Sequence, residues 1–174
     1  MGRSNHTLLE EVIESWQFAR HGVLAEATTL PDEAYGFKPH PQARSVSGLL
    51  RHIVESGLVM VGELTNTEGD FTRKSHEDFV REFAEGLPGE LSPDDLRRLL
   101  DTTLAEGVSR IRAAGEVRML QVIRRFDGEM WTRSGWMNHG IAHEEYHRGQ
   151  LAMYARIQGH VPALTRMIHG DDAE

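Results

Sequence analysis

The chain contains no cysteine among its 174 residues. Disulfide bridges, thiolate nucleophiles and cysteine-based zinc or iron–sulfur sites are therefore excluded, and any metal must be held by His, Asp or Glu. No apolar run approaches the roughly 18 residues that a membrane-spanning helix requires. The 19 Lys and Arg residues are scattered and the formal net charge is −8, so the basic patch that binds nucleic acid is missing. We expect a cytoplasmic protein that binds neither nucleic acid nor membrane.

The chain does contain strong helical periodicity. Its length predicts a single domain, residues 1–174, large enough to bury a core. Apolar residues at i+3 and i+4 spacing indicate four long helices. They run from Thr7 to before Pro31, from Ser45 or Ser47 to about Leu64, from Ser92 to Gly115, and from Arg133 to Gln158. The pattern predicts an all-α protein.

The segments between these helices differ in character. The connections 28–45 and 65–90 are long, and the second contains a short helical pattern from Glu77 to Phe83. Before the last helix, the sequence Asp127-Gly128 between short apolar runs predicts a β-hairpin.

The most informative segment is His143-Glu-Glu-Tyr-His147-Arg-Gly-Gln150, inside the last predicted helix. Residues four apart in a helix lie on the same side, about 6 Å apart along the axis, so His143 and His147 can reach one metal ion. They occupy positions where a bundle helix normally carries Leu. Burying two neutral imidazoles is costly unless their nitrogens find partners, and a shared metal satisfies both.

A third ligand is expected from a neighbouring helix. Among the long helices, only the second offers a further histidine close to its apolar face, His52, which precedes Ile53. Three histidines with an open fourth position are typical of a catalytic metal site rather than of a sealed structural one. We therefore predict that His52, His143 and His147 hold one divalent ion.

Four further residues are candidates for supporting roles. His139 lies one turn before His143 and is too far from His147 for all three to bind one ion, so it is expected to support a ligand or to line a pocket. Gln150 can hold the second ring nitrogen of His147 or point into the pocket. Glu55 can orient a metal-bound water or pair with a basic surface residue. The role of Glu144 stays open.

The other residues of interest have plainer interpretations. Trp131 and Trp136 are assigned to core packing, with a substrate cleft as the alternative. Gly149, in a helix interior, predicts close approach of another helix or loop. A solvated surface role is expected for the remaining histidines, which are His6, His21, His40, His76, His160 and His169.

The segment also matches H-E-x-x-H, the metalloprotease motif in which the glutamate activates zinc-bound water. The extended form of that motif requires Gly and His three and six residues after the second histidine, where this chain has Gln150 and Met153. The other form requires a glutamate on a later helix, and only Glu174 follows. A protease is therefore disfavoured.

The arrangement instead resembles the DinB/YfiT-like family of metalloenzymes. The resemblance rests on Ser-Val-Ser-Gly-Leu-Leu-Arg-His52, on His143-x-x-x-His147 and on His147-Arg-Gly-Gln150 followed by Leu151. The segment from Leu30 to Pro39 is also similar to the family. The resemblance implies a four-helix bundle of up-down-down-up connectivity, a metal triad at His52, His143 and His147, and a homodimer.

The same resemblance implies a broad chemistry. Family members bind zinc, nickel or another divalent ion such as iron or manganese, and several use low-molecular-weight thiols such as bacillithiol or mycothiol. A metal held by three histidines can bind such a thiol, lower its pKa and present the thiolate to a small electrophile. We therefore expect a thiol-dependent transferase. The alternatives are a metal-dependent hydrolase and a non-catalytic, stress-associated metal-binding protein.

Overall fold

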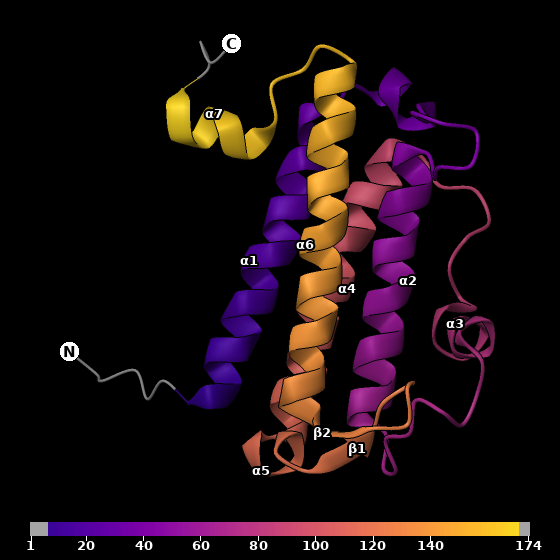
Figure 1. The fold of residues 1–174 in the computed structure, drawn as a ribbon, viewed down its shortest axis with the longest axis vertical. Helices are drawn as coiled ribbons and strands as arrows, with labels where there is room; N and C mark the ends of the chain where they lie inside the picture. The colour runs from indigo at the N-terminus through magenta and orange to yellow at the C-terminus, as the bar shows by residue number, and fades with distance from the viewer. Residues whose placement is uncertain (1–6, 171–174) are drawn as a thin grey trace.

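Four long helices form a bundle in this computed structural model, which describes residues 7–170 (Figure 1). They are α1 (Leu8–Thr29), α2 (Val46–Thr65), α4 (Pro93–Ala114) and α6 (Arg133–Ile157). In Figure 1, α1 and α6 run upward whereas α2 and α4 run downward. This up-down-down-up connectivity confirms the predicted bundle.

Each long helix begins at a Ser or Thr that caps it. The side chains of Thr7, Ser45, Ser92 and Thr132 each accept a hydrogen bond from a backbone N–H in the first turn. Such caps satisfy amide groups that have no partner within the helix. Because this signal lies in the local sequence, the predicted starts of these helices are correct to within a residue or two.

The short elements lie around the bundle, with α3 on its right side, α5 and the hairpin at its lower end and α7 at the upper left in Figure 1. They are the 3₁₀ helix η1 (Asp32–Gly36), α3 (His76–Ala84), α5 (Glu116–Met119), β1 (Val122–Arg124), β2 (Met130–Thr132) and α7 (Ala163–His169). The strands pair antiparallel, with Ile123 opposite Trp131. The short helix and the hairpin were both predicted. By contrast, α5 and α7 were not, because runs of four and seven residues carry too little periodicity.

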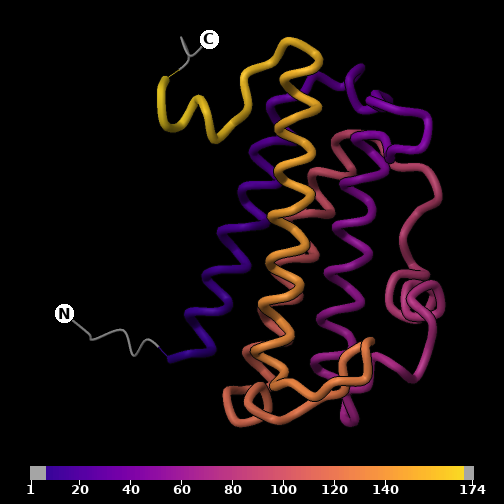
Figure 2. Tube along the Cα trace, in the orientation of Figure 1, coloured from indigo at the N-terminus to yellow at the C-terminus, as the bar shows by residue number. Residues whose placement is uncertain are grey.

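The connection between α2 and α3 pairs with the hairpin at the lower end of the bundle (Figure 2). The backbone N–H of Phe71 donates to the carbonyl oxygen of Arg124 at 2.9 Å, and the N–H of Arg124 donates to Gly69 at 3.2 Å. The buried guanidinium of Arg133 donates to carbonyl oxygens at the end of α2, including that of Leu64 at 2.7 Å. These bonds hold the end of α2 and the connection that follows it against the hairpin and the start of α6.

The hydrophobic core has two parts, separated by a polar layer. One part lies toward the ends of α1 and α6 and includes Val23, Leu50, Leu100 and Leu151. The other lies toward their beginnings and includes Trp16, Leu64, Ile111 and Met137.

The layer between the two parts holds a buried ion pair. Arg20 of α1 and Glu144 of α6 are 1% and 2% exposed, and their nearest atoms lie 2.6 Å apart. Gly57 leaves room for it, because a Cβ there would lie 2.7 Å from Arg20 Nη2. Arg20 also donates to the carbonyl oxygen of Leu100 in α4 at 3.0 Å, so the layer joins α1, α4 and α6 through polar contacts.

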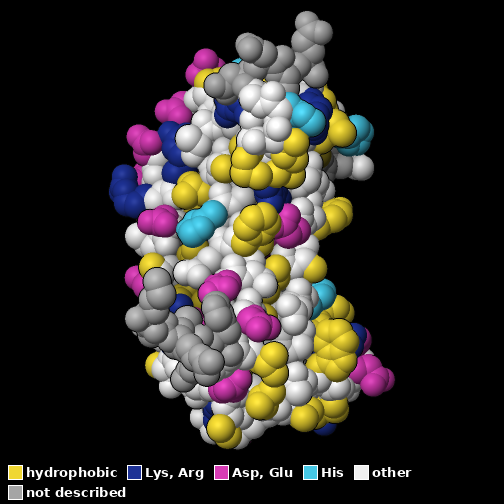
Figure 3. Space-filling view, turned by 90° about the vertical axis from the view of Figure 1, so that its left-hand side faces the viewer, with side chains coloured by type: hydrophobic (Ala, Val, Ile, Leu, Met, Phe, Trp, Pro, Cys, Tyr) yellow, Lys and Arg dark blue, Asp and Glu magenta, His cyan; other side chains and the backbone are white. Residues whose placement is uncertain are grey.

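Several side chains lie on the surface. Hydrophobic side chains are exposed among acidic and basic ones on the side where α1 and α7 lie (Figure 3). Gly149 is exposed, and a Cβ there would meet no other described atom within 4 Å, so the predicted close approach at this residue is wrong. Within residues 7–170 no helix combines the length and apolar character needed to cross a membrane. His6 and Glu174 lie outside the described residues.

Candidate metal site and adjoining cavity

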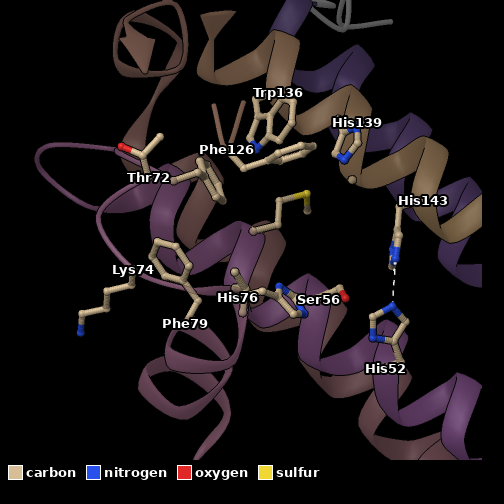
Figure 4. A pocket seen from close by; sticks show the side chains of 14 residues that line it. His52, Ser56, Thr72, Lys74, His76, Phe79, Phe126, Trp136, His139 and His143 are labelled. Atoms are coloured by element: carbon tan, nitrogen blue, oxygen red, sulfur yellow. Dashed lines mark hydrogen bonds between the residues drawn. The ribbon is translucent and has the colours of Figure 1, made fainter. Parts of the chain in front are cut away.

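The structure brings together the three histidines that were predicted to bind metal, across the gap between α2 and α6. The Nε2 atom of His143 lies 3.1 Å from Nε2 of His52 and 3.0 Å from Nε2 of His147. The ligand atoms of all three residues lie within 4.8 Å of one another. Figure 4 shows His52 and His143 facing each other from opposite helices.

These distances fit one divalent ion. Zinc bonds to imidazole nitrogen at about 2.0–2.1 Å, and tetrahedral geometry then separates two ligand nitrogens by about 3.3 Å. The separations of 3.0 and 3.1 Å would have to widen by only a few tenths of an ångström. Three neutral nitrogens leave at least one coordination position for another molecule.

Burial keeps these imidazoles neutral. It lowers the pKa of His52 to about 3, and the positive charge of Arg44 acts in the same direction. Burial and the neighbouring His147 lower the pKa of His143 to about 4. The pKa of His147 is also lowered by burial, although its hydrogen bond to Gln150 acts in the opposite direction. All three rings therefore offer an unprotonated nitrogen at neutral pH, which is the form that binds a metal.

Gln150 orients the ring of His147. Its Oε1 lies 2.7 Å from Nδ1 of His147. With the amide oxygen as acceptor, Nδ1 carries the proton and Nε2 keeps its lone pair toward His52 and His143. This is the supporting role that the spacing of three residues indicated.

Both glutamates that were considered near the site are held elsewhere by ion pairs. Glu55 accepts a hydrogen bond from Arg51 Nε at 2.7 Å, which is the basic-residue alternative. Glu144 accepts hydrogen bonds from Arg20 and, at 2.7 Å, from Trp16 Nε1. Because a helix turns by about 100° per residue, Glu144 faces α1 while His143 faces α2. Neither carboxylate belongs to the histidine cluster.

A cavity of about 430 Å³ adjoins the histidines. Its lining residues come from α2, the following connection, α3, the hairpin turn and α6 (Figure 4). They are His52, Ser56, Val59, Met60, Phe71, Thr72, Lys74, His76, Phe79, Phe126, Trp136, His139, Gly140 and His143. The volume lies within the range of about 300–1,000 Å³ that is usual for small-molecule sites.

His139 and Trp136 both line this cavity. Their rings stack with centroids 4.2 Å apart and planes 7° apart. Burial, with the positive charge of Arg125, lowers the pKa of His139, so this ring is also neutral at neutral pH. Trp136 is 4% exposed and serves both core and cavity, whereas Trp131 is 48% exposed and so does not belong to the core.

Several cavity residues carried no signal in the sequence. His76 is exposed, as expected, but its ring lies 6.3 Å from that of His52 and lines the cavity mouth. Phe71, Phe79 and Phe126 come from segments that share no periodicity with α2 or α6. Only the folding of these segments against the bundle places them in the cavity that His52 and His143 also line.

The sequence model of the DinB superfamily matches residues 15–151, which include all three histidines. No curated protein sequence is significantly similar to the chain.

Several solved structures share the fold. YjoA, a DinB-like protein from Bacillus subtilis, is 21% identical over 87% of this chain and 93% of its own, with a TM-score of 0.66. YfiT from Bacillus subtilis, described as a probable metal-dependent hydrolase with an unusual four-helix bundle topology, is 13% identical over 91% and 93%, with a TM-score of 0.67. A mycothiol-dependent maleylpyruvate isomerase is 15% identical over 82% of this chain and 60% of its own, with a TM-score of 0.64. At these identities the likeness shows a common fold.

Proposed function

The chain belongs to the DinB superfamily, and on that premise we propose that it is a metal-dependent enzyme whose centre is formed by His52, His143 and His147. The observation that carries this proposal is the convergence of three Nε2 atoms at the end of a cavity of small-molecule size. A purely structural metal site would be closed, usually by four protein ligands. Here three ligands and an adjoining cavity favour a reacting centre.

The preferred reaction is transfer of a low-molecular-weight thiol to a small electrophile. A divalent ion at this centre, with zinc or nickel preferred over iron or manganese, would lower the pKa of a thiol that binds to it. The chain has no cysteine of its own, so a nucleophilic sulfur has to come from a cosubstrate. One solved structure of the same fold is a mycothiol-dependent isomerase, which supports this choice.

Each protein group has a defined part in this proposal. His52 and His143 present their nitrogens from opposite helices, and Gln150 holds His147 in the tautomer that can bind. The aromatic side chains line the part of the cavity away from His52 and His143, where an apolar part of a substrate would bind.

Hydrolysis is the second candidate. It is favoured by the likeness to YfiT, which is described as a probable metal-dependent hydrolase. A hydrolase and a thiol transferase require the same three ligands and differ in the molecule that enters the open position. A non-catalytic metal-binding protein is the third alternative, and it predicts no turnover with either nucleophile.

The first experiment measures bound metal. Purified protein, reconstituted with zinc or nickel, should contain about one ion per chain by atomic emission, as expected for one site of three histidines. The double variant His143→Ala/His147→Ala should lose it. His21→Ala, which removes an exposed histidine from α1, is the matched control and should keep it. Wild-type protein that binds no ion after reconstitution would remove the basis of the proposal.

The second experiment separates the two reactions. Panels of activated electrophiles and esters are offered to metal-loaded protein with and without a small thiol such as mycothiol or bacillithiol. A transferase loses turnover when the thiol is omitted, whereas a hydrolase continues without it. Turnover that survives His143→Ala/His147→Ala would count against both.

A further inference from the structure

The cavity beside the histidines has two chemically different ends. His52 and His143 stand at one end, and aromatic side chains form the other. The Trp136 ring contacts those of Phe71 and Phe126, with centroids 5.6 and 5.3 Å away. Phe79 continues the wall, 5.9 Å from Phe71. Aromatic rings attract one another edge to face or with offset stacking, so this wall favours a flat ring between its members.

The cavity offers little to a charged ligand. Among the lining residues that the structure describes, Lys74 is the one with a permanent charge. Its Nζ lies 3.0 Å from Oε2 of Glu82, and in Figure 4 its side chain points away from the aromatic wall. The lining residues include neither Asp nor Glu. A bound ligand would therefore have to be neutral where it meets the wall, because burying an unpaired charge is costly.

Ser56 provides one polar contact between the two ends. It lies one turn after His52 on α2, about 6 Å along the helix axis. Its Oγ is buried and has no hydrogen-bond partner within residues 7–170. A buried hydroxyl normally has such a partner, and rotation of the Ser56 side chain about its Cα–Cβ bond would bring Oγ to a polar group of a ligand in the cavity.

We propose that this cavity binds a neutral aromatic small molecule, whose ring lies against Trp136 and Phe126 and whose polar group meets Ser56. Its role as the second substrate, with the reacting group directed at the histidines, rests on the proposed function. Binding of the ring itself depends on the wall and does not require the metal. The substrate class is thus an aryl compound, not an anionic aliphatic one.

The test uses 2-naphthol as the probe and isothermal titration calorimetry as the measurement, on metal-loaded protein and on protein stripped by chelation. Both forms should bind it. Phe126→Ala should weaken binding about 5-fold, since one aromatic contact is lost. Phe126 is 63% exposed, so this change spares the core. Phe18→Ala is the matched control, because Phe18 is 64% exposed on α1 and lies outside the cavity. It should leave the affinity unchanged.

A second variant tests the polar contact. Ser56→Ala should weaken 2-naphthol about 5-fold, as expected for one hydrogen bond, and leave naphthalene unaffected. Equal affinity for the saturated analogue decahydro-2-naphthol would overturn the aromatic assignment. Tighter binding of 2-naphthoate than of 2-naphthol by the stripped protein would overturn the inference that the ligand is neutral. Absence of 2-naphthol binding, or equal losses in Phe126→Ala and Phe18→Ala, would overturn the site itself.

Failure of the proposed function has a different signature. If the protein bound no metal or showed no thiol-dependent turnover, 2-naphthol would still bind and still respond to Phe126→Ala. Conversely, if the protein did not bind 2-naphthol, it would still contain the metal ion expected at the three histidines.

Discussion

At the scale of single residues, the contact between Gln150 and His147 predicts how well His147 would bind a metal. Its Oε1 accepts from Nδ1 of His147 at 2.7 Å and so keeps Nε2 unprotonated. Groups that orient ligating histidines in this way typically contribute about 10–100-fold to metal affinity. We expect Gln150→Ala to weaken zinc binding about 10-fold, measured by competition with a chromophoric chelator. Gln42→Ala, at an exposed loop position, is the control. Equal affinities in the two variants would contradict the orienting role.

The lowered pKa values of the histidines predict how metal-free protein responds to acid. The pKa of His52 is about 3 and that of His143 about 4 in the folded chain, against about 6.5 for an unperturbed histidine. As the pH falls below 6.5, the unfolded chain takes up protons that the folded chain does not. The free energy of unfolding should therefore decrease from pH 6.5 toward pH 4.

Urea denaturation at a series of pH values checks this. The histidine contribution is the difference between wild type and His52→Ala/His143→Ala, since both share every other titrating group. The wild type should lose more stability between pH 6.5 and pH 4 than the variant. Parallel pH profiles would show that the two imidazoles titrate normally.

At the scale of elements, α1 and α6 are joined by the buried ion pair of Arg20 and Glu144, and Glu144 follows His143 in the sequence but faces away from the three histidines. Removing one partner of such a pair leaves an uncompensated buried charge, which typically costs about 3–5 kcal/mol. We expect Glu144→Ala to lower the free energy of unfolding by about that amount in chemical denaturation.

The neighbouring residue provides the control. Glu145 pairs with Arg148 through a side chain that is 40% exposed, so Glu145→Ala should cost less than about 1 kcal/mol. If both changes had the same small effect, the pair between Arg20 and Glu144 would not hold the helices together. Folded Glu144→Ala protein should still bind zinc like the wild type, because Glu144 does not belong to the histidine cluster.

At the scale of the whole molecule, a metal at the three histidines would tie α2 to α6. A ligand at about 100 times its Kd stabilises the folded state by about 2.7 kcal/mol. For a domain of this size, that corresponds to a rise in Tm of about 5–10 °C. Zinc should produce this shift in the wild type and in His21→Ala when unfolding is followed by circular dichroism. His52→Ala lacks the ligand from α2, and a full shift in that variant would contradict the three-histidine site.

The oligomeric state of the protein stays a prediction. The family resemblance implies a homodimer, and exposed hydrophobic side chains on α1, α6 and α7 include Phe18, Tyr146, Met153 and Met167. Sedimentation velocity would measure the oligomeric state directly.

The sequence by itself determined those features that depend on neighbouring residues along the chain. The spacing of apolar residues located the long helices, and the spacing of four residues placed His143 and His147 on one side of α6. The contact between His147 and Gln150 also depends only on neighbouring residues, because a spacing of three residues in a helix brings the Gln150 amide within reach of the His147 ring. Local propensity and helical periodicity are encoded within a few residues, so they can be read without knowing the fold.

Only the tertiary structure decided which distant segments meet. It directed Glu144 to Arg20 instead of to the histidines, and it set His52 3.1 Å from His143 across the bundle. It also assembled the cavity, where Phe71 and Phe126 reach Trp136 because the α2–α3 connection pairs with the hairpin. Such contacts depend on packing and on backbone pairing between segments 50 or more residues apart, and no local pattern in the sequence records them.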